Sequence, residues 1–172
     1  MHKLTVVLVL IALLLATPCI AFQNEPGGFR WLKWGSAPEK YPKMLRMIDE
    51  HPVNNRETTY SRGGETVPGG GEILYSYLDG RFYGVTIMCQ NFSCISDLLK
   101  SLTSLHGPGK NSDAKETIAR SWNGDTTMID LYCDTKIGFG FAGIYSTKLS
   151  KEREAMERAE KQKLPWMRGT VK

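Results

Sequence analysis

The 172-residue sequence is poor in the residues that most often carry catalysis and metal binding. It holds three histidines and four cysteines, and no two cysteines have the CxxC spacing of a zinc or redox site. No pair of acidic residues lies in an apolar stretch that would shift a carboxyl pKa. The sequence therefore predicts no catalytic residue, no cofactor and no metal ligand.

Long apolar runs and a basic face are also absent. The longest largely apolar run, 4–16, is shorter than the ~20 residues that a membrane-spanning helix needs. Residues 22–147 hold 13 basic and 14 acidic residues, whereas residues 148–172 hold eight basic and four acidic ones. A neutral body with a basic tail lacks the electrostatic footprint of a nucleic-acid-binding domain. We therefore expect no nucleic-acid partner.

The start of the chain has the parts of a secretion signal. Lys3 gives a basic start, 4–16 an apolar core, and Ala21 a small residue before the cut. The signal holds one basic and no acidic residue, so the mature chain would carry a net charge of +3. Cys19 is the alternative attachment point of a lipoprotein, but Pro18 stands where that signal needs a small residue. We expect a periplasmic or secreted protein without lipid.

Hydrophobic periodicity predicts strands and helices in alternation. Period-two patterns predict strands at 29–34, 57–62, 73–78, 82–89, 117–122, 127–133 and 137–146. Asp79-Gly80 and Asn123-Gly124 predict tight hairpins between pairs of these strands. The order predicts an α+β domain over residues 29–147, with a mainly antiparallel sheet and helices packed on one face. A polar leader, 22–28, would precede this domain.

Helices are expected from Ser36, over 93–106 and from Ser150 to about Lys163. Ser36 can cap its helix, and 93–106 places leucines on one face before Gly107. The segment 43–49 suits either a helical turn or a strand, and the glycine-rich segment 63–71 suggests a flexible loop. Residues 148–172 would form a charged, basic C-terminal helix and tail.

Two patterns invite a stronger interpretation. The hairpin around Asn123 matches that around Asp79 at a shift of 44 residues, which allows duplication of a helix-plus-hairpin unit. Residues 138–143 match the letters of a GxGxxG dinucleotide loop. The sequence after Gly143 continues a strand where that loop would open a helix, so we expect a strand whose glycines admit large neighbours.

The remaining cysteines and aromatic residues give the candidate site residues. Cys89 and Cys94 are close enough along the chain to form a disulfide, with Cys133 a buried free thiol. A Cys89–Cys133 bridge is the alternative, if the two hairpins are neighbours. Four aromatic side chains are candidate contact residues, with burial in the core as the alternative: Trp31, Trp34, Phe82 and Tyr83.

Aromatic residues and turn glycines recur between residues 29 and 133. They are Phe29, Trp34-Gly35, Tyr60, Arg62, Tyr75, Tyr77, Gly80-Arg81-Phe82, the segment from Leu99 to Gly107, and Trp122. This series resembles a group of exported proteobacterial proteins of unknown function. The resemblance implies export and a shared framework, but no activity.

These patterns favour an exported, non-catalytic protein that binds a protein or envelope partner. The alternative is a periplasmic hydrolase or thiol-dependent enzyme with an unrecognised site. The basic tail offers a further role at a membrane surface, through Trp166 and Met167 beside Arg168. The sequence assigns no ligand and no oligomeric state.

We predict that the exported protein starts near Phe22 and carries no lipid. Intact mass spectrometry of protein isolated from the cell envelope measures both properties. A diacylglyceryl mass on Cys19, or retention of Met1, would contradict this prediction.

Overall fold

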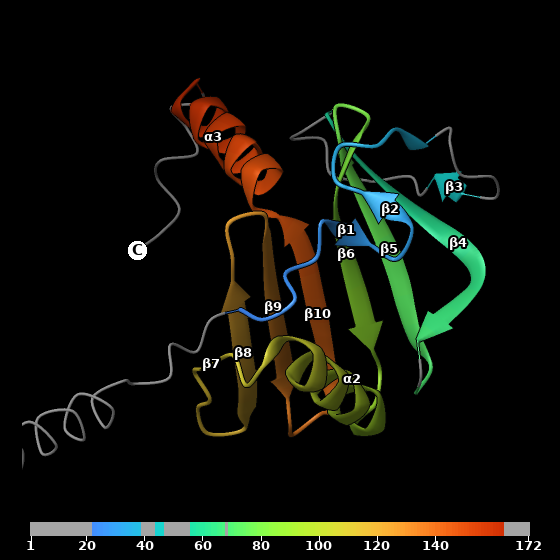
Figure 1. Cartoon of the computed structure of the whole chain (residues 1–172), viewed down its shortest axis with the longest axis vertical. Coiled ribbons are helices and arrows are strands. Elements are labelled where there is room, and N and C mark those ends of the chain that lie inside the picture. The colour runs from blue at the N-terminus through green and yellow to red at the C-terminus, as the bar shows by residue number, and fades with distance from the viewer. Residues whose placement is uncertain (1–21, 39–43, 47–55, 68, 164–172) are drawn as a thin grey trace, which may run out of the picture.

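The chain folds around one eight-stranded antiparallel sheet (Figure 1). The structure, a computed structural model, describes residues 22–38, 44–46, 56–67 and 69–163. The strand order is β3-β4-β5-β6-β10-β9-β8-β7. Their bounds are β3 Met44–Arg46, β4 Glu57–Val67, β5 Gly71–Leu78, β6 Arg81–Cys89, β7 Lys110–Asn111, β8 Thr117–Asn123, β9 Thr127–Asp134 and β10 Phe139–Ser146.

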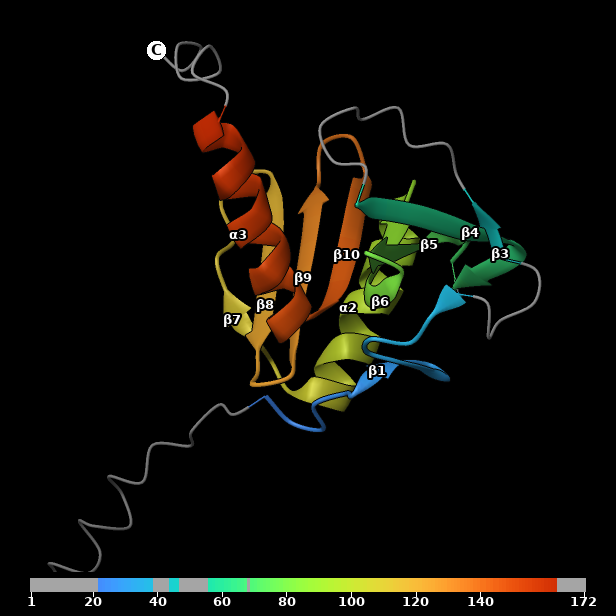
Figure 2. The same cartoon turned by 90° about the horizontal axis from the view of Figure 1, so that it is seen from above.

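The remaining elements are two short strands and two helices. A two-stranded sheet pairs β1 (Gly28–Phe29) with β2 (Leu32–Lys33). Helix α2 (Phe92–His106) packs on the same face of the large sheet as β1, as seen from above in Figure 2. Helix α3 (Thr147–Lys163) lies against the opposite face. The expected α+β class with a mainly antiparallel sheet is confirmed, but the two described helices lie on opposite faces and not on one, because Leu149 of α3 packs with Leu78 and Tyr83.

Strand alternation divides the buried side chains between the two faces. The face under α2 holds the main core, in which Val85, Ile87 and Leu131 are almost completely buried. On the other face a smaller cluster joins Leu78 and Tyr83 to Leu149 of α3. The period-two pattern of each strand therefore sets which face a residue serves.

Glycines in β10 serve packing, as the sequence predicts. A Cβ atom at Gly140 would lie 2.5 Å from Cδ1 of Ile95, so the glycine lets α2 approach the sheet. The GxGxxG letters therefore belong to a strand, and no helix opens at Gly143. This position carries no sign of a dinucleotide loop.

The tight turn at Asp79-Gly80 and the helix end at Gly107 are confirmed, whereas the second hairpin differs in its turn. Asp79 and Gly80 both have positive φ, +49° and +71°, the conformation of a tight two-residue hairpin. Residues 124–126 connect β8 to β9, one residue more than a two-residue turn. The side chain of Asn91 accepts a hydrogen bond from the Cys94 N–H (2.9 Å) at the start of α2, and Gly107 ends this helix at φ +84°.

Two local predictions differ from the structure. The predicted strand 29–34 is a hairpin, because Arg30 (φ +53°) turns the chain between β1 and β2. The predicted loop 63–71 is shorter, because β4 continues to Val67 past an irregularity between Ser61 and Thr66. The Ser36 hydroxyl donates to the Lys33 carbonyl (2.7 Å), and most of the helix that Ser36 was expected to cap lies outside the described residues.

The ambiguous segment 43–49 contains a strand, β3. The remainder of the predicted helix after Pro38, the secretion signal 1–21 and the tail 164–172 lie outside the described residues.

The structure does not confirm the proposed duplication. The hairpins β5–β6 and β8–β9 lie on either side of β10, and each pairs with β10, not with the other hairpin. The first hairpin is followed by α2, whereas the second is followed by β10. The similarity of the two hairpins therefore reflects their amphipathic pattern.

Helix α3 begins three residues earlier than expected, and its first turn packs on the sheet. Leu149 and Ser150 are buried, and Arg153 lies 3.5 Å from a carboxylate oxygen of Glu57 on β4. The start of α3 therefore belongs to the packed domain. In the described part of the chain, no helix has the length and apolar character needed to cross a membrane.

We predict that Leu149→Ala lowers the free energy of unfolding by about 2–4 kcal/mol, because it leaves a cavity beneath α3. Leu105→Ala is the matched control, since Leu105 is 55% exposed and Leu149 only 5%, and it should cost less than about 1 kcal/mol. Urea denaturation of both variants checks this. Equal losses would show that α3 contributes no specific packing.

Candidate functional site

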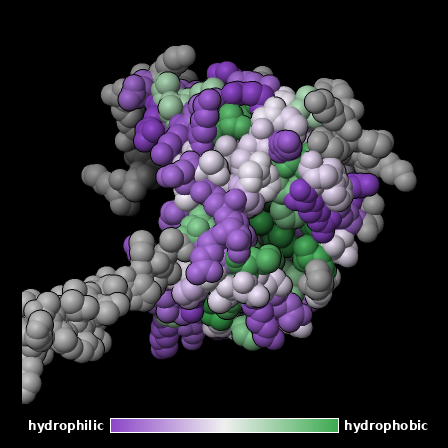
Figure 3. Space-filling view, in the orientation of Figure 1, coloured by the Kyte–Doolittle hydropathy of each residue, from purple (hydrophilic) through white to green (hydrophobic). Residues whose placement is uncertain are grey.

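The most apolar cavity described lies between α2 and the β1–β2 hairpin. We call it the α2 groove, and its volume is about 360 Å³, within the size range of small-molecule pockets. Figure 3 shows hydrophobic surface set back between the positions of β1 and α2. Its lining residues are Pro26, Gly28, Phe29, Arg30, Val67, Ile87, Asp97, Leu98, Ser101, Leu102, Leu105, His106, Ile129 and Ile144.

The floor of the groove comes from the middle of the sheet. Ile87 of β6, Ile144 of β10 and Ile129 of β9 lie on three neighbouring strands and point to the face under α2. Because β-branched side chains are stiff at χ1, they give this floor a fixed shape. The floor is thus part of the hydrophobic core, and its three isoleucines are at most 7% exposed.

One wall of the groove is a face of α2. Its lining positions run from Asp97 to His106 with helical spacing, a length of ~14 Å at 1.5 Å per residue. The sequence predicts an apolar face here, but treats all of it as buried. Leu102 is 5% exposed and Leu105 is 55% exposed, so the outer end of the face reaches the groove's mouth.

The opposite wall is the segment 22–30, which we call the strap. The sequence suggests only a polar leader here. Gln23 N–H donates to the carbonyl of His106 (3.3 Å), and the Asn24 side chain donates to the carbonyl of Leu105 (2.8 Å). Phe22 packs edge-on against the His106 ring, at 5.2 Å between centroids. These contacts fasten the strap to the last turn of α2.

Glu25 fastens the strap to the sheet. Its carboxylate accepts hydrogen bonds from the backbone N–H groups of Thr126 and Thr127, at 2.5 and 2.6 Å. Burial alone would raise the pKa of Glu25, but these N–H donors outweigh it and lower the pKa. The Thr127 hydroxyl adds bonds to the Pro26 carbonyl and to the Trp34 indole N–H.

Charged groups at the mouth of the groove already have partners. Arg30 pairs with Glu65, and Glu65 also accepts a hydrogen bond from the Tyr75 hydroxyl (2.7 Å). Nδ1 of His106 lies 3.0 Å from the carbonyl oxygen of Gln23. The groove therefore presents an apolar interior beneath a rim of polar groups bonded to the protein itself.

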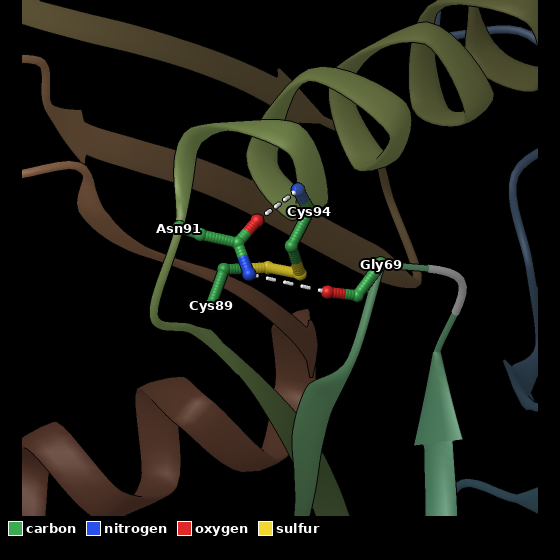
Figure 4. Close-up of a disulfide and its surroundings, with 4 residues drawn as sticks. All are labelled: Gly69, Cys89, Asn91 and Cys94. Carbon is green, nitrogen blue, oxygen red and sulfur yellow. Dashed lines mark hydrogen bonds between the residues drawn. A yellow bond between two sulfur atoms is a disulfide. The ribbon is translucent and has the colours of Figure 1, made fainter.

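A disulfide fixes the other end of α2 (Figure 4). Cys89 at the end of β6 and Cys94 in the first turn of α2 are bonded, with Cα atoms 5.6 Å apart. The side chain of Asn91, which caps the helix, also donates to the carbonyl of Gly69 (3.4 Å). Cys133 is a buried free thiol, and burial together with Asp134 raises its pKa. The pairing is the one that the short spacing favours.

The four candidate contact aromatics do not come together on the surface. Phe82 and Tyr83 are buried on opposite faces of the sheet, and Trp34 stacks on Phe82 at 5.1 Å between centroids. Trp31 is half exposed and lies near Arg62. Backbone hydrogen bonds from Gly35 N–H to the Phe82 carbonyl (2.8 Å) and from Phe82 N–H to the Ser36 carbonyl (2.9 Å) hold Phe82 next to Trp34. Periodicity does not reveal this long-range contact.

Comparisons with protein-family models, with curated proteins and with solved structures find no match. The α2 groove is therefore interpreted from its own geometry.

We predict that Glu25→Gln lowers the melting temperature at pH 7 by roughly 2–4 °C, as expected for a loss of about 1 kcal/mol of hydrogen bonding. The folded pKa of Glu25 is lowered, so its stabilisation is complete above the ordinary glutamate pKa of 4.5 and is lost as pH falls through the folded pKa. The difference between variant and wild type should therefore shrink in acid. Differential scanning calorimetry across pH checks this, with the exposed Glu72→Gln as control; a pH-independent difference would contradict it.

Proposed function

We propose that this protein is an exported, non-catalytic binding protein whose α2 groove holds the acyl chain of a ligand or envelope partner. The observation that carries the proposal is an accessible cavity whose floor is core isoleucine from three neighbouring strands. Concave, mostly apolar cavities with few polar groups are the usual form of small-molecule sites. The secretion signal expected at 1–21 supports export of the protein.

The shape and polarity of the groove favour an acyl chain. The cavity follows α2 for ~14 Å, and the polar groups at its rim, Arg30 and His106, are bonded to Glu65 and Gln23. An occupant would find no free donor or acceptor on the isoleucine floor. A linear apolar group would fill this space and leave its polar end in solvent.

The expected affinity is modest. Burial contributes about 0.8 kcal/mol per CH₂ group, so a chain with about eight buried methylenes gains roughly 6 kcal/mol before the cost of association. A gain of 6 kcal/mol corresponds to about 40 μM before that cost, so we expect dissociation constants of about 0.1 mM to a few millimolar. The disulfide and the strap would raise affinity by holding both walls of the groove in place before binding.

The cysteines give no support to the alternative, a thiol-dependent enzyme. Cys89 and Cys94 are joined to each other, and Cys133 is buried with a raised pKa. A nucleophilic thiol needs a lowered pKa and access to substrate. A binding role agrees better with these three residues.

We predict that Ser101→Trp weakens decanol binding at least tenfold, because Ser101 is exposed at the groove and an indole there would occupy the ligand's space. Ser104→Trp is the matched control, since Ser104 is exposed on α2 outside the residues that line the groove. Isothermal titration calorimetry of the mature protein and both variants measures the affinities. Unchanged binding by Ser101→Trp, or no binding by the wild type, would reject the acyl-chain groove.

A further inference from the structure

A second cavity lies on the opposite face of the sheet, between β-strands and α3. We call it the α3 cleft, and its volume is about 290 Å³. It is lined by Glu57, Ser76, Tyr83, Thr86, Met128, Asp130, Tyr145, Ser150, Arg153 and Glu154. The α2 groove shares none of these residues. Three carboxylates and one guanidinium give this lining a net charge of −2.

The floor of the cleft depends on two glycines. A Cβ atom at Gly84 would lie 2.2 Å from the ring of Tyr145, and a Cβ atom at Gly143 would lie 2.1 Å from it. The ring of Tyr145 therefore lies flat on the backbone of β6 and β10. The ring also stacks with that of Tyr83, at 6.1 Å between centroids, and both tyrosines line the cleft.

Most polar groups in the cleft are bonded to one another. The Tyr83 hydroxyl donates to Glu57, which also accepts from Arg153. The Tyr145 hydroxyl lies 3.0 Å from the hydroxyl oxygen of Thr86. Burial, and then the bond to Glu57, raise the pKa of Tyr83, so this hydroxyl stays neutral. The network fixes the tyrosines and neutralises Arg153.

Asp130 differs from these groups. It pairs directly with Gly143 across β9 and β10, and the Tyr145 ring lies over Gly143. Asp130 is therefore a neighbour of this ring. Within the described residues, its carboxylate has no hydrogen-bond or ion-pair partner, and its side chain is only partly exposed. Burial raises the pKa of Asp130, which shows the cost of leaving this charge without a counter-ion.

We propose that the α3 cleft binds a small organic cation, an alkylammonium group, with Asp130 as its counter-ion and the Tyr145 ring as the surface for its alkyl part. A carboxylate supplies a charge-assisted acceptor for the ammonium N–H groups. The exposed face of an aromatic ring attracts the same cation through its quadrupole. Met128 adds a polarizable apolar contact beside the ring.

The lining favours an organic cation over a metal ion. Calcium takes six to eight oxygen ligands and magnesium needs near-octahedral oxygen coordination, whereas Glu57 is engaged by Tyr83 and Arg153. Among the described residues, no group of three or more His, Cys, Asp or Glu side chains is placed to hold a metal ion. Glu154 also has no partner among the described residues, but it is exposed on α3. Asp130 is the partly buried carboxylate without a partner, and its place beside an aromatic ring suits a single ammonium group.

Butylammonium chloride and n-butanol test the proposal, since they share a chain length and differ in charge. Titrations of the mature protein are followed by amide ¹H–¹⁵N chemical shifts. Butylammonium should bind in the millimolar range and shift amides of β9, β10 and the start of α3, and butanol should not bind there. Asp130→Asn should weaken butylammonium binding by about ten- to a hundredfold, because a hydrogen bond to a charged group is lost.

Two variants distinguish a specific site from nonspecific electrostatic attraction of the cation to the protein. Asp125→Asn removes the same charge from the exposed β8–β9 loop and should leave affinity unchanged, and Tyr145→Phe keeps the ring and should retain binding. Three results would each overturn the proposal: no butylammonium binding, equal binding by Asp130→Asn and wild type, or equal loss in Asp125→Asn. Ser101→Trp in the α2 groove should leave butylammonium binding unchanged, so the proposals for the two sites are tested independently.

Discussion

The antiparallel pairing of β6 with β10 is the constraint on which the rest of the structure depends. It joins strands far apart in the sequence, with registered pairs from Gly140 opposite Cys89 to Tyr145 opposite Gly84. Without this pairing, β3–β6 and β7–β10 would form two separate sheets, and β6 and β10 would become edge strands with unpaired backbone groups. The cost is the loop-closure entropy of a long-range contact, which α2 offsets by packing on both strands.

This pairing also determines where a cavity can form. Gly140 lets Ile95 reach the sheet, so the first part of α2 packs tightly, while the disulfide holds its start. Beyond Ile95 the α2 groove lies between the helix and the strap, above the isoleucine floor. The strap is held near its start, where Gln23 bonds to His106 and Glu25 to the Thr126–Thr127 backbone, and at its end, where Arg30 pairs with Glu65. The α2 groove is therefore the space between two walls that are each fixed elsewhere.

The sequence predicts local features of this fold well and long-range ones poorly. Asp79-Gly80, the extent of α2 and the strand around Gly140 follow from turn chemistry and periodicity. The burial of Phe82 under Trp34, and the anchoring of the strap by Glu25, depend on segments that meet only after folding. For the groove, periodicity identifies the apolar face of α2, but not that its outer end is left uncovered, because this depends on the path of residues 22–30.

The two faces of one strand pair support different chemistry because alternation gives each face its own side chains. Toward α2, positions 85, 87, 142 and 144 are apolar and bury a continuous core. Toward α3, positions 84 and 143 are glycine, and the space above them takes one ring, Tyr145. Larger residues there would displace that ring and fill the cleft. Burial of Tyr83 then requires a partner for its hydroxyl, which Glu57 supplies while also binding Arg153. Asp130 is then the charged side chain of the floor that has no partner in the described structure. Gly84 and Gly143, which make room for the Tyr145 ring, also leave space beside this unpaired carboxylate.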